Sequence, residues 1–546
     1  MENPTVRNPK TAGSALARHW PWLLVLFAVL FSGYIRVRLL SMPLERDEGE
    51  YAYAGQLLLQ GIPPYELAYN MKLPGTYFIC AAGMALFGTT DVGLHLTLLV
   101  AGSLTIVFVF LLGRKLFGPV AGVVAAVTYA VMSISPAVAG LAAHANHFVV
   151  LFAVPATLVL LSAVASGSRK GLLVSGLLYG LAFLMKQQGI CFGLFGGLLL
   201  AWHSRQALFT AEFFRRGLWF GAGILLPFGV TCLYLAVAGV FPQFWFWTFT
   251  YAHSYVASTP WPEGVQNLAS QLKLTFDLLA GFWLIAVLAI PLALITRRSR
   301  RELALVVGFG LCSFLGTAMG LYFRPHYFIL SLPAFALLVG AGIALLQQLR
   351  PRFLTDVFKT LPLLLLALVL SWFVYYQAQI FFEWSADAVV QNLYRMNPFL
   401  EARTVAGYLR AHSTSAARIA VIGSEPEVYF YAQRHSATGV IYTYPLMEDQ
   451  PNAVVMQRQM ISEIETNRPE YIVHFPQMLS WLTKSTSDRT IFTWLTNYSA
   501  QYYEPVGVVG PNARGQTEYL WDDALKARPR AIQPGDIVIY KRRPQS

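Results

Sequence analysis

Eleven apolar segments follow one another along residues 20–381, and they constrain the fold more than any other feature of the sequence. A helix needs about 20 apolar residues to cross a bilayer. The segments lie at 20–40, 92–113, 118–135, 148–165, 171–185, 189–203, 217–240, 276–296, 303–322, 327–347 and 359–381. Two of them, 171–185 and 189–203, are short, so we expect them to be tilted or buried among other helices. The pattern predicts an α-helical polytopic membrane protein of about eleven spans.

Positive charges are distributed unevenly among the loops that join these segments. With the N-terminus in the cytoplasm, the inside loops carry sixteen lysines and arginines and the opposite loops carry five. Cytoplasmic loops of membrane proteins are enriched in these residues. We therefore expect a multi-pass protein of a bacterial inner (plasma) membrane with a cytoplasmic N-terminus and a first span that is retained. The net charge of +12 follows from this topology, so no nucleic-acid partner is expected.

The C-terminal part of the chain differs in character. Residues 384–546 carry sixteen basic and fifteen acidic residues, and they mix helical stretches with the β-like runs ARIAVIG, PEYIVHF and GDIVIYKR. This mixture predicts a soluble α/β domain. An odd number of spans places that domain outside the cytoplasm. We therefore expect a transmembrane domain at 1–383 and an extracytoplasmic, periplasmic domain at 384–546.

The first outside loop, 41–91, begins with the stretch LERDEGEYAYAGQLL, in which four acidic residues occupy six positions. Acidic surface loops are common, but this one lies where the chain leaves the membrane. The run EYAYAGQLLLQ predicts a helix along the interface, with its tyrosines at the level of the lipid headgroups. The apolar run 74–88 contains Pro74 and several glycines. Counting it as a span would destroy the charge bias, so we interpret it as a second interfacial helix.

Further outside turns hold polar residues between apolar segments. These are His144, Asn146 and His147; Lys186 and Gln187; and Arg324 and His326. Two histidines three residues apart could share a helix face and bind a metal, although interfacial polarity explains them as well without a third ligand. The loop 241–275 is rich in aromatic residues, which suits an interfacial belt, a surface for a lipid chain or a surface that stacks on a sugar.

The charged residues on this face suggest a reaction. Carboxylates at a membrane exit suit a general base, and nearby cations suit a phosphate leaving group. The carboxylates here are those of residues 45–50, and the cations are Lys72, Lys186 and Arg324. An enzyme with both kinds of group could act on a phosphate-linked lipid at the membrane surface.

Taken together, these features resemble the GT-C superfamily of membrane glycosyltransferases. The similarity is to glycosyltransferase family 39-like enzymes, the bacterial relatives of the protein O-mannosyltransferases and of the lipid A aminoarabinose transferase. Those enzymes have one span followed by an outside loop with an Asp-Glu pair, here Asp47-Glu48 and then Tyr51. The family's Lys-Pro-Pro element and the aromatic after it are similar to 72–77, KLPGTY, which contains Lys72 and Tyr77.

The resemblance extends over nearly the whole chain. GLLYGLAFLMKQQG, with Lys186 and Gln187, and YFRPHYFILSLPAFALL, with Arg324, His326 and Tyr327, look like two further family segments. The tail phrase VIGSEPEVYFYAQRHSATGVIYTYPL is similar to the soluble end of bacterial members. The chain departs from the family where many relatives carry a glutamate in the second outside loop, because it has Ala145-Asn146-His147 there.

The resemblance implies transfer of a sugar from a polyprenyl-phosphate donor to an acceptor glycan, lipid or protein on the extracytoplasmic face of the lipid bilayer, with inversion. It implies that Asp47 is the general base or positions the acceptor, with support from Glu48. The implied donor phosphate ligands are Lys72, Lys186, Arg324 and His326. The implied substrate contacts are Tyr51, Tyr77, His144, Asn146, His147, Gln187 and Tyr327. No organic cofactor is implied, and a divalent metal stays open.

Three alternatives differ in kind from a transferase of this type. A transporter or lipid flippase would place ionisable groups near the membrane midplane, whereas these cluster at one face. A polymerase or ligase of surface glycans would typically have its large loop between late spans. A non-catalytic scaffold would leave the cations Lys186 and Arg324 unexplained.

Overall fold

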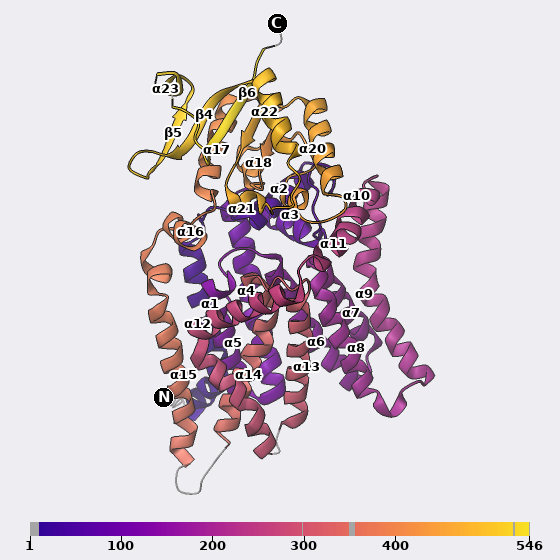
Figure 1. The fold of residues 1–546 in the computed structure, drawn as a ribbon. Helices are drawn as coiled ribbons and strands as arrows, with labels where there is room; N and C mark the ends of the chain where they lie inside the picture. The colour runs from indigo at the N-terminus through magenta and orange to yellow at the C-terminus, as the bar shows by residue number, and fades with distance from the viewer. Residues whose placement is uncertain (1–9, 297–298, 349–354, 528–529, 545–546) are drawn as a thin grey trace, which may run out of the picture.

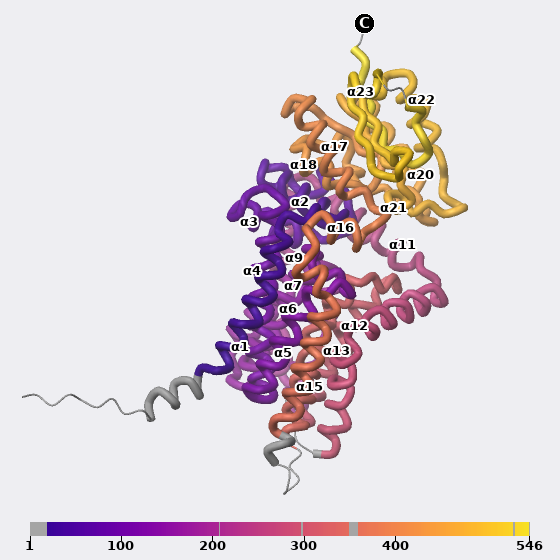
Figure 2. The backbone as a smooth tube through the Cα atoms, turned by 90° about the vertical axis from the view of Figure 1, so that its left-hand side faces the viewer, coloured from indigo at the N-terminus to yellow at the C-terminus, as the bar shows by residue number. Residues whose placement is uncertain are grey.

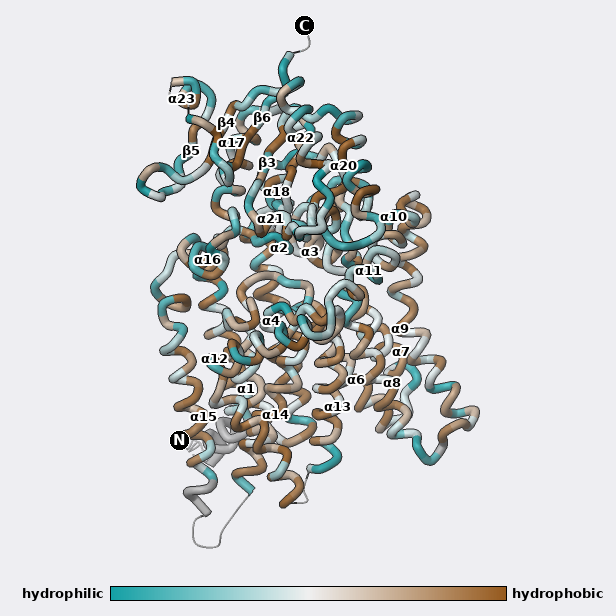
Figure 3. The backbone as a smooth tube through the Cα atoms, viewed as in Figure 1, coloured by the Kyte–Doolittle hydropathy of each residue, from teal (hydrophilic) through white to brown (hydrophobic). Residues whose placement is uncertain are grey.

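The computed structural model describes residues 10–296, 299–348, 355–527 and 530–544. Long helices form a bundle, and a mixed helix and sheet region covers one end of it (Figure 1). Hydrophobic residues dominate the bundle, and hydrophilic residues are concentrated in the region that covers it (Figure 3). The predicted fold class, a helical membrane protein with a C-terminal α/β part, is confirmed.

Each of the eleven predicted spans coincides with a helix. Eight described helices are long and apolar enough to cross a membrane: α1 (Lys10–Arg38), α4 (Asp91–Phe117), α6 (Ala145–Ser166), α9 (Ala211–Val237), α12 (Trp261–Thr296), α13 (Arg300–Ala318), α14 (Leu332–Leu346) with the preceding 3₁₀ turn η5 (Pro325–Ser331), and α15 (Thr355–Tyr376). The other three are shorter: α5 (Pro119–Met132), α7 (Arg169–Met185) and α8 (Ile190–His203). Since α5 packs on α4 and α14, α7 packs on α6 and α9, and α8 packs on α7 and α13, protein covers much of these short helices. The chain is a multi-pass membrane protein, and the count of eleven crossings stays a prediction.

The segment expected as an aromatic loop, 241–275, is mostly helical. It forms α10 (Phe241–Trp245), the π-helix η4 (Phe246–Tyr251), α11 (Ala252–Ala257) and the start of α12. Helix α12 bends at Leu279, where φ is −124° and ψ is 18°. Before the bend it runs across the bundle, and after the bend it follows the other long helices (Figure 2).

The acidic cluster forms the beginning of a helix. Helix α2 (Arg46–Leu59) starts in a capping box: the Glu45 carboxylate accepts from the backbone N of Glu48 at 3.0 Å, and the Glu48 carboxylate accepts from the backbone N of Glu45 at 3.2 Å. Acidic side chains in a first turn are also favoured by the helix dipole. The second expected interfacial helix is α3 (Gly75–Phe87), which packs on α2.

The tyrosines of α2 do not lie at the lipid headgroups, and that expectation was wrong. Tyr51 and Tyr53 are both buried. The Tyr51 ring lies 6.2 Å from the Tyr77 ring of α3, whereas Tyr53 is covered by the C-terminal region, which packs on α2 through α18 (Glu427–Ala432). The Tyr53 ring stacks on Tyr429 with centroids 5.1 Å apart. A Cβ on Gly49 would lie 2.6 Å from the backbone N of Glu427, so the two helices touch where the glycine allows it.

Arg46 joins the two parts of the chain at the same contact. Its guanidinium donates to the Glu425 carboxylate at 2.9 Å, to the Ser424 carbonyl at 2.5 Å and to the Asn397 side chain at 3.2 Å. The C-terminal region is therefore anchored to the first loop by a buried ion pair as well as by apolar packing.

The C-terminal region contains one six-stranded mixed sheet in the order β2-β1-β3-β6-β4-β5. Its strands are β1 (Arg418–Ile422), β2 (His435–Ser436), β3 (Tyr471–His474), β4 (Tyr503–Pro511), β5 (Thr517–Trp521) and β6 (Ile537–Arg542). Strands β2, β1 and β3 are parallel, whereas β6 is antiparallel to both of its neighbours. The other helices are α16 (Ala386–Tyr394), α17 (Phe399–His412), α19 (Tyr444–Met447), α20 (Ala453–Asn467), α21 (Met478–Trp481), α22 (Thr490–Tyr502) and α23 (Asp522–Ala527). All three β-like runs of the sequence form strands, β1, β3 and β6.

Candidate functional site

A cavity of about 400 Å³ lies between the bundle and the C-terminal region. Its walls come from α2 and the following loop, the α7–α8 link, the aromatic segment 247–256, the α13–α14 link and the loop around α19. Seven residues predicted from the sequence line it: Asp47, Lys72, Lys186, Gln187, Arg324, His326 and Tyr327. The remaining six, Glu48, Tyr51, Tyr77, His144, Asn146 and His147, do not line it directly. They are buried around it.

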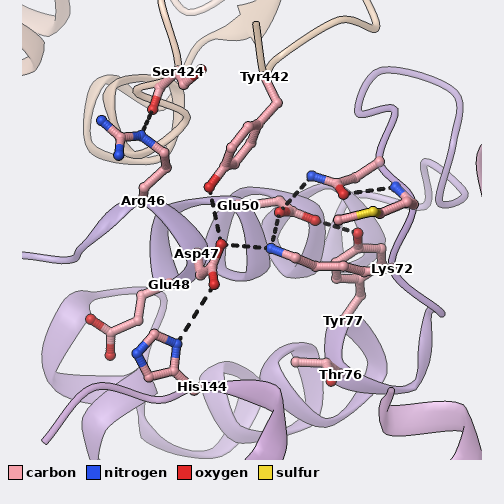
Figure 4. A network of polar contacts seen from close by, with 12 residues as sticks. Arg46, Asp47, Glu48, Glu50, Lys72, Thr76, Tyr77, His144, Ser424 and Tyr442 are labelled. Atoms are coloured by element: carbon pink, nitrogen blue, oxygen red, sulfur yellow. Dashed lines mark hydrogen bonds and ion pairs between the residues drawn. The ribbon is translucent and has the colours of Figure 1, made fainter. Parts of the chain in front are cut away.

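Asp47 is the member of the acidic cluster that reaches the cavity. Its Oδ1 accepts from Lys72 Nζ at 2.8 Å and from the Tyr442 hydroxyl at 3.0 Å (Figure 4). Its Oδ2 lies 3.7 Å from His144 Nδ1 and 3.9 Å from His326 Nε2. Burial alone would raise the pKa of Asp47, but the Lys72 ammonium and the two histidines hold that pKa well below its usual value. The carboxylate is therefore ionised across the physiological pH range.

Glu48 points away from the cavity. Its carboxylate accepts from His95 Nε2 at 3.1 Å and from the backbone N of Ala143 at 2.5 Å, and the side chain is fully buried. It thus ties α2 to the loop that ends at His144. Glu48 does not line the cavity, so its predicted catalytic role stays a prediction.

Glu50 is part of the site although the sequence did not single it out. Its carboxylate binds Lys72 Nζ at 2.6 Å, Asn70 Nδ2 at 2.7 Å and the Tyr77 hydroxyl (Figure 4). A spacing of three residues from Asp47 places both acids on one face of α2, which is the signal that could have identified it. Lys72 is therefore shared by two carboxylates, and its charge is largely neutralised within the protein.

Lys186 and Arg324 are the cations of the cavity that have no acidic partner. Within the described chain, neither lies within ion-pair distance of a carboxylate. Lys186 Nζ donates to Asn146 Oδ1 at 3.0 Å and lies 4.3 Å from the centre of the Tyr327 ring. Burial and the charges of Lys72 and Arg324 lower the pKa of Lys186 to about 7, against the opposing effect of Asp47. Both cations therefore line the same cavity as the Asp47 carboxylate.

The histidines do not form the pair that the sequence suggested. His144 precedes α6 and stacks on His326, with ring centroids 4.1 Å apart, whereas His147 is buried and its ring nitrogens have no partner in the described chain. Asp47, His144 and His326 offer three ligand atoms within 4.8 Å of one another. These residue types fit Zn²⁺ or Mn²⁺, and such an ion would supply positive charge toward a phosphate. The Lys72 ammonium beside Asp47 competes for the same position.

Four cavity residues, Tyr442, Tyr444, Pro445 and Glu448, come from the C-terminal region and were missed as site residues. The Tyr251 hydroxyl donates to Glu448 at 2.7 Å. Tyr442 is 395 residues from Asp47 in the chain. The only signal was the family-like tail phrase that ends in YTYPL, which pointed to a segment but not to a role.

Comparison with known proteins agrees with this architecture. The model of the dolichyl-phosphate-mannose-protein mannosyltransferase family matches residues 72–230. An undecaprenyl phosphate-alpha-4-amino-4-deoxy-L-arabinose arabinosyl transferase of Pseudomonas aeruginosa is 29% identical over 251 residues, and one of Pseudomonas paraeruginosa is 28% identical. Each of these matches covers 43% of this chain and 43% of the relative, so less than half of those relatives is represented.

Solved structures match over almost the entire chain. ArnT from Cupriavidus metallidurans bound to undecaprenyl phosphate has a TM-score of 0.61 at 15% identity, covering 96% of this chain and 98% of that one. An oligosaccharyltransferase of Archaeoglobus fulgidus in the apo form has a TM-score of 0.53 at 12% identity, covering 95% and 76%. The class defined by fold and site is thus a multi-pass membrane protein with the GT-C fold. Within that class the chain is similar in fold to ArnT from Cupriavidus metallidurans over 96% of its length.

Proposed function

We propose that this chain is a membrane glycosyltransferase that moves a sugar from a polyprenyl-phosphate donor to an acceptor hydroxyl or amine. The observation that carries the proposal is the cavity between the bundle and the C-terminal region, which is lined by an ionised carboxylate, Asp47, and by two cations without acidic partners in the described chain, Lys186 and Arg324. A phosphate-linked lipid needs this combination, since one group must accept a proton while others stabilise a departing phosphate. The relatives support the donor class, because their names include undecaprenyl phosphate.

The proposed reaction is a single displacement with inversion. The acceptor oxygen or nitrogen attacks the anomeric carbon, the bond from that carbon to the phosphate oxygen breaks, and its electron pair leaves with the polyprenyl phosphate. Asp47 takes the acceptor proton. A low pKa suffices for this base, because the acceptor becomes strongly acidic as its new bond forms. Lys186 and Arg324 stabilise the charge that grows on the phosphate, while Lys72 and Glu50 hold Asp47 in place.

We place the reaction on the extracytoplasmic side of a bacterial inner membrane, with the N-terminus in the cytoplasm. The excess of cations in the loops at the other end of the helices supports this orientation. We assign residues 1–383 to the transmembrane catalytic domain and 384–546 to an extracytoplasmic domain that closes over the cavity. Tyr442, Tyr444 and Glu448 support that closing role, because they line the cavity from the C-terminal region.

Turnover of purified protein with a panel of polyprenyl-phosphate sugars tests the function. We expect one donor to release polyprenyl phosphate in step with appearance of the glycosylated acceptor. If the folded protein neither binds nor consumes any donor, the transporter alternative replaces the transferase.

We expect kcat/KM for the donor to change with pH as the Lys186 ammonium loses its proton. Its pKa of about 7 means that the ammonium is present below neutral pH and is lost as pH rises. We expect kcat/KM for the donor to fall above pH 7. Lys186→Arg should remove that fall, because a guanidinium stays charged over this range. A pH profile that is the same in wild type and variant would contradict the assignment.

We expect transfer to continue in the presence of EDTA. The positive charge near the phosphate comes from Lys186 and Arg324, and the Lys72 ammonium occupies one oxygen of Asp47 at 2.8 Å. Transfer with and without EDTA, beside a metal analysis of the purified protein, measures this. Loss of transfer that Mn²⁺ or Zn²⁺ restores would instead assign Asp47, His144 and His326 as metal ligands.

A further inference from the structure

A second cavity, of about 440 Å³, lies at the end of the bundle opposite to the first. Its apolar wall consists of four leucines from four helices, Leu116 of α4, Leu161 of α6, Leu199 of α8 and Leu305 of α13. Its rim is polar and comes from the end of α8, the 3₁₀ turn η3 (Arg205–Ala207) and the start of α13. The turn between α8 and α9 is hydrophilic, whereas the helices that it joins are mostly hydrophobic (Figure 3). The cavity is therefore amphipathic.

Two arginines on the rim, Arg205 and Arg301, have neither an ion pair nor a hydrogen bond in the described part of the chain. Nearby cations are satisfied within the protein: Arg300 donates to the Leu294 carbonyl at 2.7 Å, and Arg216 pairs with Glu212 at 3.1 Å. One carboxylate, Glu302, also lines the cavity. Two guanidinium groups against one carboxylate leave the rim positively charged.

The positive-inside bias explains cations at this end of the bundle, but it does not explain their position over an apolar cavity. Guanidinium groups bind phosphate oxygens in a bidentate manner, and basic pockets between membrane helices bind anionic lipid headgroups. The leucine wall offers a surface for an acyl chain, and a soluble phosphate would not use it. Trp202, 39% exposed at the rim, is the aromatic type that is enriched at membrane interfaces.

We propose that this second cavity binds an anionic glycerophospholipid, with its phosphate on Arg205 and Arg301 and an acyl chain along the four leucines. The site is separate from the proposed transfer reaction and uses none of its residues. Its ligand is a structural lipid of the surrounding bilayer and not the sugar donor.

Native mass spectrometry of the full chain in neutral detergent tests the proposal with dioleoyl phosphatidylglycerol as the probe. We expect Arg205→Gln/Arg301→Gln to weaken its binding about tenfold or more, because two charge-assisted contacts are lost. Arg169→Gln/Lys170→Gln is the matched control, since these exposed cations lie at the same end of the bundle but outside the cavity. Arg324→Gln shows whether any of the bound lipid occupies the first cavity, which Arg324 lines. Glycerophosphoglycerol, the same headgroup without chains, should bind far more weakly.

Each other outcome overturns the proposal in a different way. Equal loss in the Arg169→Gln/Lys170→Gln control would mean diffuse attraction to a charged surface. Equal binding of glycerophosphoglycerol would mean a soluble phosphate site that does not use the leucines. Loss only in Arg324→Gln would assign the bound lipid to the first cavity, and unchanged binding in every variant would exclude the arginines.

Discussion

Asp47→Asn is expected to reduce the rate of sugar transfer by about 10³-fold while the protein still folds and binds its donor. Loss of a general base typically costs 10²- to 10⁴-fold, and the amide cannot take the acceptor proton. The asparagine oxygen can still accept from Lys72 and Tyr442, so the local structure should persist. Single-turnover rates and donor binding, measured side by side in both proteins, check the result.

Glu66→Gln is the control for this experiment, because Glu66 is an exposed acid of the same outside loop that does not line the cavity. It should transfer sugar at the wild-type rate. Full activity of Asp47→Asn would show that the acidic cluster only builds the start of α2 and that the base lies elsewhere. Loss of donor binding in Asp47→Asn would show a binding role in place of proton transfer.

Arg46→Ala should lower the free energy of unfolding by about 3–5 kcal/mol, because it leaves the Glu425 carboxylate buried without its partner. Arg46 is 7% exposed and Glu425 is fully buried, and their contact joins α2 to the C-terminal region. Thermal unfolding and protease cleavage between the two parts of the chain both report this change. We expect cleavage after residue 383 to become faster.

Two further variants test whether the loss of stability comes from breaking the buried Arg46–Glu425 pair and not from removing an arginine in general. Arg46→Met/Glu425→Leu removes both charges and should recover much of the lost stability, since buried pairs often exchange for apolar residues at little cost. Arg403→Ala breaks the exposed pair with Asp387, which should cost less than about 1 kcal/mol. Equal destabilisation by Arg46→Ala and Arg403→Ala would contradict the anchoring role of Arg46.

Much of the fold could be predicted from the sequence because apolar length and charge bias are local signals. The short helices α5, α7 and α8 were recognised, and so were the strands β1, β3 and β6. The environment of α2 could not be predicted. Its tyrosines have the pattern of an interfacial helix, and nothing in the local sequence shows that α18 covers Tyr53 and that Tyr77 of α3 lies against Tyr51. The hydrophobic pattern of a helix does not show which distant segment of the chain will bury it.

For the candidate site, the sequence predicted several of the residues but not their partners. Asp47, Lys186 and Arg324 lie at the ends of apolar segments, where charge is costly, and they are found in one cavity. The partners of these groups were not predictable. Glu50 was counted in the acidic cluster but was given no role of its own, and Glu48 contacts His95 and Ala143 instead of lining the cavity. Such pairings depend on how helices turn toward one another, which spacing alone does not specify.

The hydrogen bond from Tyr442 to Asp47 has a consequence for the order of events during synthesis. The carboxylate emerges among the first residues of the chain, yet its surroundings are completed by a segment made about four-fifths of the way through translation. The wall of the cavity that contains Tyr442, Tyr444 and Glu448 is therefore complete only after the C-terminal region has been made. We expect a chain that ends before residue 442 to insert its helices into the membrane but to lack the proposed transfer activity, so that membrane insertion and activity would be separate stages.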